Sequence, residues 1–224
     1  MGAWLACVVV VGLWAAVSAA GEPSDAGPRR GRDAGTGRPG GGAATTAPDA
    51  DALVVGMPAP NFVLRTLNAE QSGMTAVSTR AMFGPEPTAP ARALVLDFAA
   101  SYCEPCKREL PALDALAARY RGRGVVWAVV LIDRDDAGRD AMRTWMVDVL
   151  AFAHPVLADR FALLARRYGV NELPHLVLID GGGTVRWIRA GFRDDTLSTL
   201  EGELGRLLGP VPVAESAAPG APTP

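Results

Sequence analysis

Two cysteines, Cys103 and Cys106, have the clearest capacity for chemistry in this chain, because only two residues separate them. The one further cysteine, Cys7, lies in an N-terminal hydrophobic run. A single C-x-x-C pair is too few for a disulfide scaffold, and a chain of 224 residues can bury a core without one. We therefore expect the pair to be reactive and not structural.

The position of the pair favours a reactive thiolate at Cys103. A compact apolar strand is expected over 94–98, and a helix is expected from Pro105, a residue suited to the first helical position. Backbone N–H groups and the helix dipole stabilise an anion at such a start. Cys106 lies one turn deeper on the same side, where it can attack a mixed disulfide formed on Cys103. We expect Cys103 to be the exposed nucleophile and Cys106 to be the resolving thiol.

Two simpler uses of the pair are a zinc site and a static disulfide. Zinc needs two further ligands, and the domain offers only His154 and His175, which are not in a paired spacing. A disulfide across so short a loop constrains little of the unfolded chain. We therefore expect redox activity, with no metal and no cofactor.

The elements that position the cysteines follow from hydrophobic periodicity. Strands or strand-like segments are expected at 61–65, 76–82, 94–98, 125–132, 175–179 and 184–188. Helices are expected at 105–120, 139–152 and 161–168, with a last one built on Leu197, Leu200, Leu204 and Leu207. Strands and helices alternate, and a hairpin with its turn at 180–183 precedes the last helix. This order predicts an α/β fold with a central mixed β-sheet flanked by helices on both faces.

Composition divides the chain into four segments. Residues 1–20 carry no charged side chain and end in small residues, which is typical of a signal peptide or an uncleaved membrane anchor. Residues 21–51 predict a disordered linker, and 210–224 predict a disordered tail. The domain is expected over 52–209, in the bacterial periplasm, with membrane contact only through the N-terminal segment. A net charge of -2 without a basic stripe argues against nucleic acid.

Three blocks of sequence resemble one family. The run 94–111 around the two cysteines is similar to the thioredoxin-like thiol-disulfide oxidoreductases of the TlpA/ResA type. Upstream, 55–62 resembles that family's domain opening, which is shared with the peroxiredoxin-related AhpC/TSA superfamily. Downstream, 168–174 and 178–180 resemble the segment that holds its cis-proline. The resemblance covers 54–208 and implies a thioredoxin fold with an N-terminal strand extension.

The resemblance implies roles for several residues. Pro174 matches the cis-proline that binds extended substrate, and Pro111 matches a proline that kinks the active-site helix. Glu109 matches an acidic residue near the active site; the alternative is an exposed first-turn glutamate, which the helix dipole favours. The expected substrate contacts are Tyr102, Glu104, Pro105, Leu173, Pro174 and His175.

A carboxylate, Asp97, interrupts the apolar strand six residues before Cys103, where cytoplasmic thioredoxins carry a buried aspartate. TlpA-like relatives often have asparagine there. Burial raises the pKa of a carboxyl group, which would let Asp97 accept the Cys106 proton during resolution. The alternative is a hydrogen-bonded buried aspartate with no catalytic duty.

Two positions depart from the family pattern. Tyr102 replaces the usual tryptophan before the first cysteine, and it still offers an apolar face with a polar tip. His175 stands where a small hydroxyl residue is typical after Pro174. Beside the sulfurs, His175 would stabilise the thiolate or make substrate binding pH-sensitive; otherwise it is a semi-exposed residue at a strand start.

Glu104 indicates the direction of electron flow. Its negative charge beside Cys103 raises the thiol pKa, which favours the reducing side of the redox range, and Lys107 partly offsets this effect. With the resemblance, this predicts a monomeric reductase of extracytoplasmic protein disulfides. The resemblance implies apocytochrome c as a substrate, through cytochrome c maturation, and a membrane protein as the electron donor.

Two other functions fit the motif less well. Peroxiredoxin-like thiol peroxidases need a threonine three residues before the attacking cysteine, where this chain has Ala100. Sco-like copper-binding proteins use Cys-x-x-x-Cys with a distant histidine, whereas two residues separate the cysteines here.

Overall fold

A computed structural model describes residues 53–209 of the chain. The expected signal peptide or anchor (1–20), linker (21–51) and tail (210–224) lie outside the described residues. Among residues 53–209, no helix is long and apolar enough to cross a membrane.

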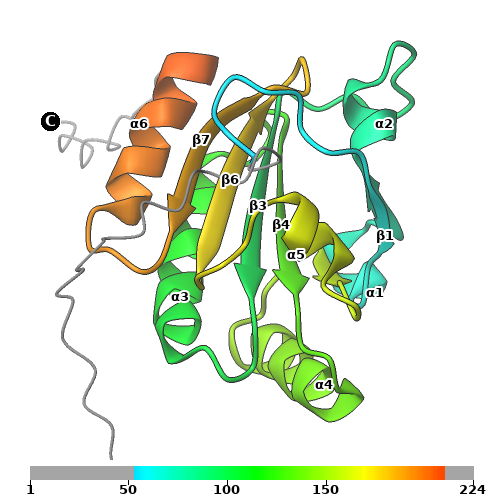
Figure 1. Cartoon of the computed structure of the whole chain (residues 1–224), viewed down its shortest axis with the longest axis vertical. Helices are drawn as coiled ribbons and strands as arrows, with labels where there is room; N and C mark the ends of the chain where they lie inside the picture. Colours follow the sequence, from blue (N-terminus) through cyan, green and yellow to red (C-terminus); the bar gives the residue numbers. More distant parts are fainter. Residues whose placement is uncertain (1–52, 210–224) are drawn as a thin grey trace, which may run out of the picture. The chain divides into compact units, whose positions relative to one another are not determined.

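A five-stranded mixed sheet forms the centre of the domain, in the strand order β5-β4-β3-β6-β7 (Figure 1). The strands are β3 (Ala93–Ala99), β4 (Val125–Leu131), β5 (Val156–Ala158), β6 (His175–Asp180) and β7 (Val185–Ala190). β3 pairs parallel with β4 and antiparallel with β6, so the central strand joins a parallel half to an antiparallel half. β6 and β7 form the expected hairpin, with its turn after Asp180.

Helices cover both faces of this sheet, which confirms the expected architecture. The helices are α3 (Glu104–Arg119), α4 (Asp136–Thr144), α5 (Leu163–Arg167) and α6 (Thr196–Leu208). One core cluster joins residues of α3, α4 and α6 to one face of β3, and the other joins residues of α5 to the opposite face. Because both faces are covered, every residue of β3 is buried, and its sequence is a nearly continuous apolar run.

An N-terminal extension packs beside the main sheet. Its strands β1 (Val63–Arg65) and β2 (Ala76–Ser78) form an antiparallel pair, with α1 (Ala69–Ser72) between them. A backbone bridge from Thr66 to Leu157 connects this extension to β5. The expected N-terminal strand extension is therefore present.

The structure differs from the sequence prediction in the bounds and type of two elements. The segment 76–82 is a strand only to Ser78, whose side chain accepts the Ala81 N–H at 3.3 Å and so caps a short helix, α2 (Thr79–Phe83). The helix expected over 139–152 begins earlier, at Asp136, because the Asp135 side chain caps it. It then widens into a π-helical turn, η1 (Trp145–Val149). Both errors come from capping side chains that hydrophobic periodicity does not register.

Candidate redox site

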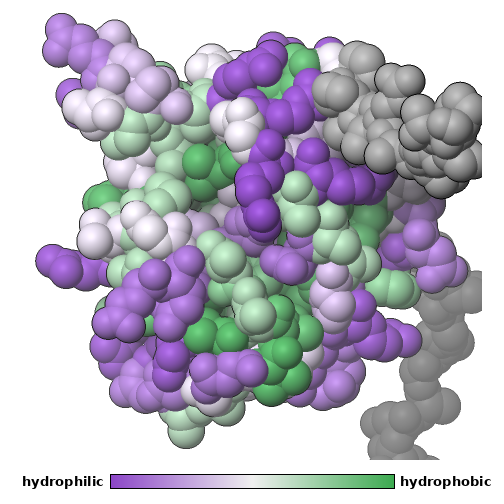
Figure 2. Space-filling view, turned by 180° about the vertical axis from the view of Figure 1, so that it is seen from behind, coloured by the Kyte–Doolittle hydropathy of each residue, from purple (hydrophilic) through white to green (hydrophobic). Residues whose placement is uncertain are grey.

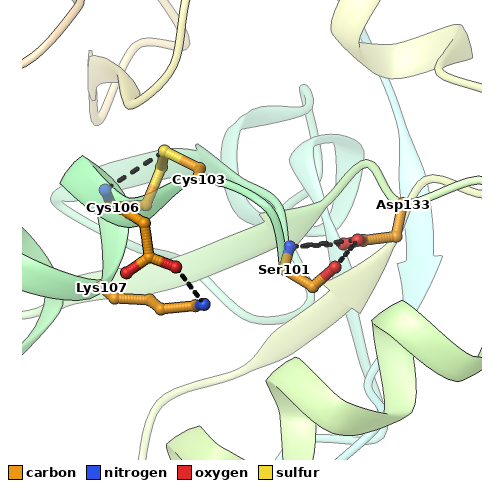
Figure 3. Close-up of a disulfide and its surroundings, with 6 residues drawn as sticks. Ser101, Cys103, Cys106, Lys107 and Asp133 are labelled. Carbon is orange, nitrogen blue, oxygen red and sulfur yellow. Dashed lines mark hydrogen bonds and ion pairs between the residues drawn. A yellow bond between two sulfur atoms is a disulfide. The ribbon is translucent and has the colours of Figure 1, made fainter.

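The two cysteines form a disulfide at the start of α3, just after the loop that follows β3 (Figure 3). The S–S distance is 2.06 Å and the Cα atoms lie 5.3 Å apart. Cys103 is the N-cap residue of α3, and its Sγ accepts the backbone N–H of Cys106 at 3.1 Å. The sulfur therefore lies at the positive end of a 16-residue helix, the environment that stabilises a thiolate.

The helix begins one residue before the expected start, at Glu104, with Pro105 in its first turn. Proline is suited to this position, because its missing N–H has no intrahelical partner to lose. Pro111, which matches the family's helix-kinking proline, lies inside the helix and is exposed to solvent.

Cys103 is less accessible to solvent than the expected exposed nucleophile. In the disulfide form Cys103 is only 6% exposed, and Cys106 is fully buried. The neighbouring Tyr102 is 70% exposed and lines a groove beside Cys103, so the sulfur is reached from that groove and not from an open surface. Cys103 remains the more accessible of the two.

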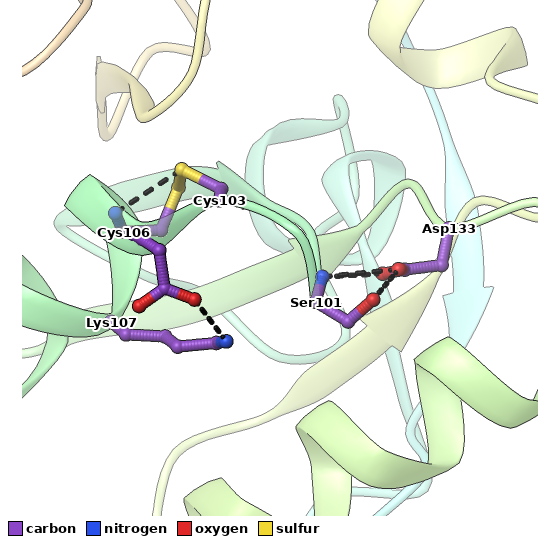
Figure 4. Close-up of polar contacts among 6 residues, drawn as sticks. Ser101, Cys103, Cys106, Lys107 and Asp133 are labelled. Atoms are coloured by element: carbon purple, nitrogen blue, oxygen red, sulfur yellow. Dashed lines mark hydrogen bonds and ion pairs between the residues drawn. A yellow bond between two sulfur atoms is a disulfide. The ribbon is translucent and has the colours of Figure 1, made fainter.

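The loop before Cys103 is held by an aspartate that lies just beyond the end of β4 (Figure 4). The Asp133 carboxylate accepts the Ser101 N–H at 3.0 Å and the Ser101 hydroxyl at 2.5 Å. Ala99 and Leu131 are paired across β3 and β4, so Ser101 and Asp133 each lie two residues beyond this residue pair. Our sequence reasoning missed both residues, although parallel strands bring their carboxyl ends to one edge and Asp133 directly follows an apolar strand.

Two buried carboxylates lie on the side of the sheet that holds the disulfide. Asp97 points to the same face as Val95 and Ala99, which belong to the core cluster that contains both cysteines. Glu109 follows Cys106 by three residues on α3 and is 3% exposed. The alternative expectation of an exposed first-turn glutamate is therefore wrong, because this face of α3 packs onto the sheet.

Neither carboxylate has a hydrogen-bond partner among the described residues. Burial raises the pKa of Asp97 well above its usual value, and the nearby charge of Glu109 raises it further. Burial raises the pKa of Glu109 to about 7. The Glu109 carboxyl group can therefore hold or release a proton near neutral pH. The alternative of a hydrogen-bonded Asp97 finds no support in this geometry.

Glu104, the charge between the cysteines, is itself paired. Lys107 Nζ lies 2.7 Å from Glu104 Oε1, and the Glu104 side chain is 75% exposed. Solvent and the lysine both weaken the field that Glu104 exerts at the sulfur. The expected partial offset by Lys107 thus has a direct structural basis.

The Leu173–Pro174 peptide bond is cis, as the resemblance implied. Leu173 lines the same groove as Cys103, so the segment before β6 and the disulfide share one surface. The groove has a volume of about 410 Å³.

His175 is placed differently from both expectations. It is 3% exposed, so it is not a semi-exposed residue. In the antiparallel pairing of β3 with β6 it lies opposite Phe98, with ring centroids 6.0 Å apart, on the face away from the cysteine cluster. The side chain of His175 thus points to the α5 side of the sheet. The cause is the alternation of side chains along a strand, which register decides.

The surface at the α4 end of the domain contains both hydrophobic and hydrophilic residues. Figure 2 shows the domain from behind, and hydrophobic residues lie among hydrophilic ones in the lower half of that view, which is the half that holds α4 in Figure 1.

Within residues 53–209, no group of three or more His, Cys, Asp or Glu side chains is arranged to hold a metal ion.

A mixed sheet, a C-x-x-C disulfide at the start of α3 and a cis-proline before β6 together define a thioredoxin-fold thiol-disulfide protein. The sequence profile of the Redoxin family matches residues 54–204. The chain belongs to this family.

Known proteins with similar sequences and structures agree with this class. The chain is 26% identical over 159 residues to thiol-disulfide oxidoreductase ResA of Bacillus anthracis, covering 71% of this chain and 82% of that one. It is 26% identical over 136 residues to thioredoxin-like protein YneN of Bacillus subtilis, covering 61% and 71%.

Among solved structures, one similar to this chain is a Chlorobium tepidum protein provisionally named thiol:disulfide interchange protein DsbE. Its TM-score is 0.58 at 27% identity, and the match covers 70% of this chain and 100% of that one. The chain is accordingly a thiol-disulfide oxidoreductase of the ResA and DsbE type, which confirms the TlpA/ResA resemblance.

Proposed function

We propose that this enzyme reduces disulfides in proteins outside the cytoplasm, with Cys103 as nucleophile and Cys106 as resolving thiol. One observation carries the assignment: Cys103 Sγ caps α3, accepts a backbone N–H and lies at the groove, whereas Cys106 is fully buried. The sulfur at the helix end is the one whose thiolate is stabilised, and it is the one a substrate can reach.

The reaction moves two electrons in two exchange steps. The Cys103 thiolate attacks one sulfur of a substrate disulfide, and the other substrate sulfur leaves as a thiolate that takes up a proton. Cys106 then loses its proton and attacks Cys103 Sγ, which releases the second substrate thiolate and forms the enzyme disulfide. A dithiol protein, which we place at the membrane, must then reduce this disulfide before another turnover.

Asp97 is the proposed acceptor of the Cys106 proton. Its side chain points to the face of β3 that packs against the cysteine cluster, is 1% exposed, and has no hydrogen-bond partner among the described residues. Burial raises the pKa of Asp97, which makes its carboxylate a stronger base toward the Cys106 thiol. Glu109 lies one helical turn beyond Cys106, and its charge adds to the effect of burial in raising the pKa of Asp97.

The substrate lies in the groove beside Cys103. Tyr102, Pro105 and Leu173 line it, and their apolar surface suits the side chains that flank a substrate cysteine. Pro174 follows Leu173 directly, and we propose that it and the backbone of His175 guide an extended substrate segment. Glu104 is exposed at the first turn of α3, where it faces solvent and incoming substrate.

The negative charge of Glu104 beside Cys103 favours reduction over oxidation. This charge disfavours a thiolate at Cys103, and a less stable thiolate makes a weaker oxidant. An equilibrium with glutathione measures this balance. A potential as oxidising as that of DsbA would contradict the reductase proposal.

The sequence and its relatives support the proposed location and substrate. The uncharged segment 1–20 supports export as a signal peptide or anchor, with 21–51 as linker, 52–209 as domain and 210–224 as tail. The ResA-type resemblance supports apocytochrome c as substrate and cytochrome c maturation as process. We propose that the enzyme acts as a monomer.

Trapping tests the assignment of the two cysteines. In Cys106→Ala the mixed disulfide cannot be resolved, so partner proteins should remain covalently linked through Cys103. Cys103→Ala is the matched control and should trap nothing. Equal trapping by both variants, or by neither, would contradict the proposed roles.

A further inference from the structure

The groove beside the disulfide is mostly apolar, with two polar residues, Asn171 and Glu172, at one end of its lining segment. Tyr102, Pro105, Ile132, Val170 and Leu173 provide apolar surface, and Glu172 is the only charged residue among residues 53–209 that lines it. Glu172 is exposed and lies two residues before the cis-proline, next to the path proposed for the substrate.

The Glu172 carboxylate has a defined place in the fold. It lies over Gly191, where an added Cβ would collide with Glu172 Oε1. The Gly191 N–H donates to the Pro174 carbonyl at 2.9 Å, so the end of β7 is held against the substrate-facing segment. The absence of a side chain at residue 191 leaves room for the carboxylate beside the groove.

Within the described part of the chain, this carboxylate also lacks a counter-charge. Among residues 53–209, no hydrogen bond or ion pair involves the Glu172 side chain, whereas Glu104, the acidic residue after Cys103, is paired with Lys107 at 2.7 Å. An unpaired charge beside a mostly apolar groove attracts an opposite charge from a bound segment and disfavours a like charge.

We propose that Glu172 determines substrate specificity by pairing with a lysine or arginine close to the substrate cysteine. This inference rests on the proposed function. Because one groove contains both Cys103 and Glu172, the basic residue lies within a few positions of the reacting cysteine along an extended segment. The preferred substrate thus presents a cysteine flanked by an apolar residue and a basic one.

Matched peptides test this specificity. Each peptide carries one cysteine as a mixed disulfide with 2-mercaptoethanol, and the two flanking positions on either side hold lysine in one series and glutamate in the other. Pre-reduced wild-type enzyme should react with the lysine series about threefold to tenfold faster, in the second-order rate constant of a single turnover, at low salt. Glu172→Gln should remove most of this preference, and Glu172→Lys should reverse it.

Two controls separate this inference from the proposed function. Glu86→Lys changes the net charge equally, in an exposed loop after α2 that does not line the groove, and should keep the wild-type preference. The uncharged bis(2-hydroxyethyl) disulfide should react equally with all variants. If the enzyme fails to reduce this small disulfide, the proposed function fails. If it reduces it but every variant shows the same peptide preference, Glu172 is not a specificity residue.

Discussion

The carboxylate of Asp133 accepts two hydrogen bonds from Ser101, one from its backbone N–H and one from its hydroxyl. This relationship fixes the loop only two residues before Cys103 to the end of β4. Asp133 is 1% exposed, and its own backbone carbonyl accepts a hydrogen bond from Arg139 at 2.8 Å. The position of the nucleophile therefore depends on a residue 30 positions away in the sequence.

Replacing Asp133 should loosen the nucleophile loop. Asp133→Ala removes both acceptors and should cost about 1–3 kcal/mol in the free energy of unfolding, because the Ser101 N–H loses its partner. The rate of disulfide reduction should fall as well. Asp133→Asn keeps one acceptor oxygen and should restore part of both losses. Chemical unfolding and peptide reduction measure these changes, with the exposed Asp148→Ala as control; wild-type values for Asp133→Ala would contradict the role.

Replacing Asp97 with asparagine should slow resolution of the mixed disulfide. The variant keeps the shape of the side chain but cannot accept the Cys106 proton, so release of substrate should slow by up to about 100-fold. Stopped-flow measurement of substrate release across pH 6–9 checks this, with the exposed Asp140→Asn as control. Unchanged kinetics over that range would remove Asp97 from the mechanism.

Glu109 should make the oxidised protein less stable as pH rises. Its pKa in the folded protein is about 7, against an ordinary value of 4.5, so the folded state holds a proton that the unfolded state has lost between these pH values. The free energy of unfolding should therefore fall through this window, by at most about 3 kcal/mol from this group. Glu109→Gln should lack this loss. Urea unfolding at pH 4.5, 6 and 8 compares the two proteins, and parallel curves would refute the raised pKa.

His175 should act in the opposite direction. Burial lowers the pKa of His175 to about 4, and neither ring nitrogen has a hydrogen-bond partner among the described residues. The unfolded chain takes up a proton below about pH 6.5 that the folded protein does not, so stability should be lost as pH falls from 6.5 to 4.

His175→Leu isolates this contribution. The variant should gain up to about 3 kcal/mol relative to wild type on going from pH 7 to pH 4, measured by urea unfolding. Its rate with bis(2-hydroxyethyl) disulfide should stay near the wild-type value, because the ring lies on the face away from the sulfurs. A strong loss of this rate would show that the His175 side chain acts in the reaction.

Local pattern in the sequence was sufficient for the central features of the site. The spacing of Cys103 and Cys106, with Pro105 between them after an apolar strand, predicts a sulfur at a helix start, because capping involves residues only a few positions apart. The hairpin after Asp180 and the alternation of strands and helices were predictable for the same reason. The cis bond before Pro174 came from the resemblance and not from local physics.

Other features depend on contacts between distant residues, and only the tertiary structure decides them. Which face of α3 packs on the sheet places Glu109 in the interior, and strand register directs His175 away from the cysteines. The Ser101–Asp133 contact needs β3 and β4 side by side, and the place of the Glu172 carboxylate needs the end of β7. Sequence periodicity shows that a residue lies on a face; it does not show what packs against that face, because the partners come from elsewhere in the chain.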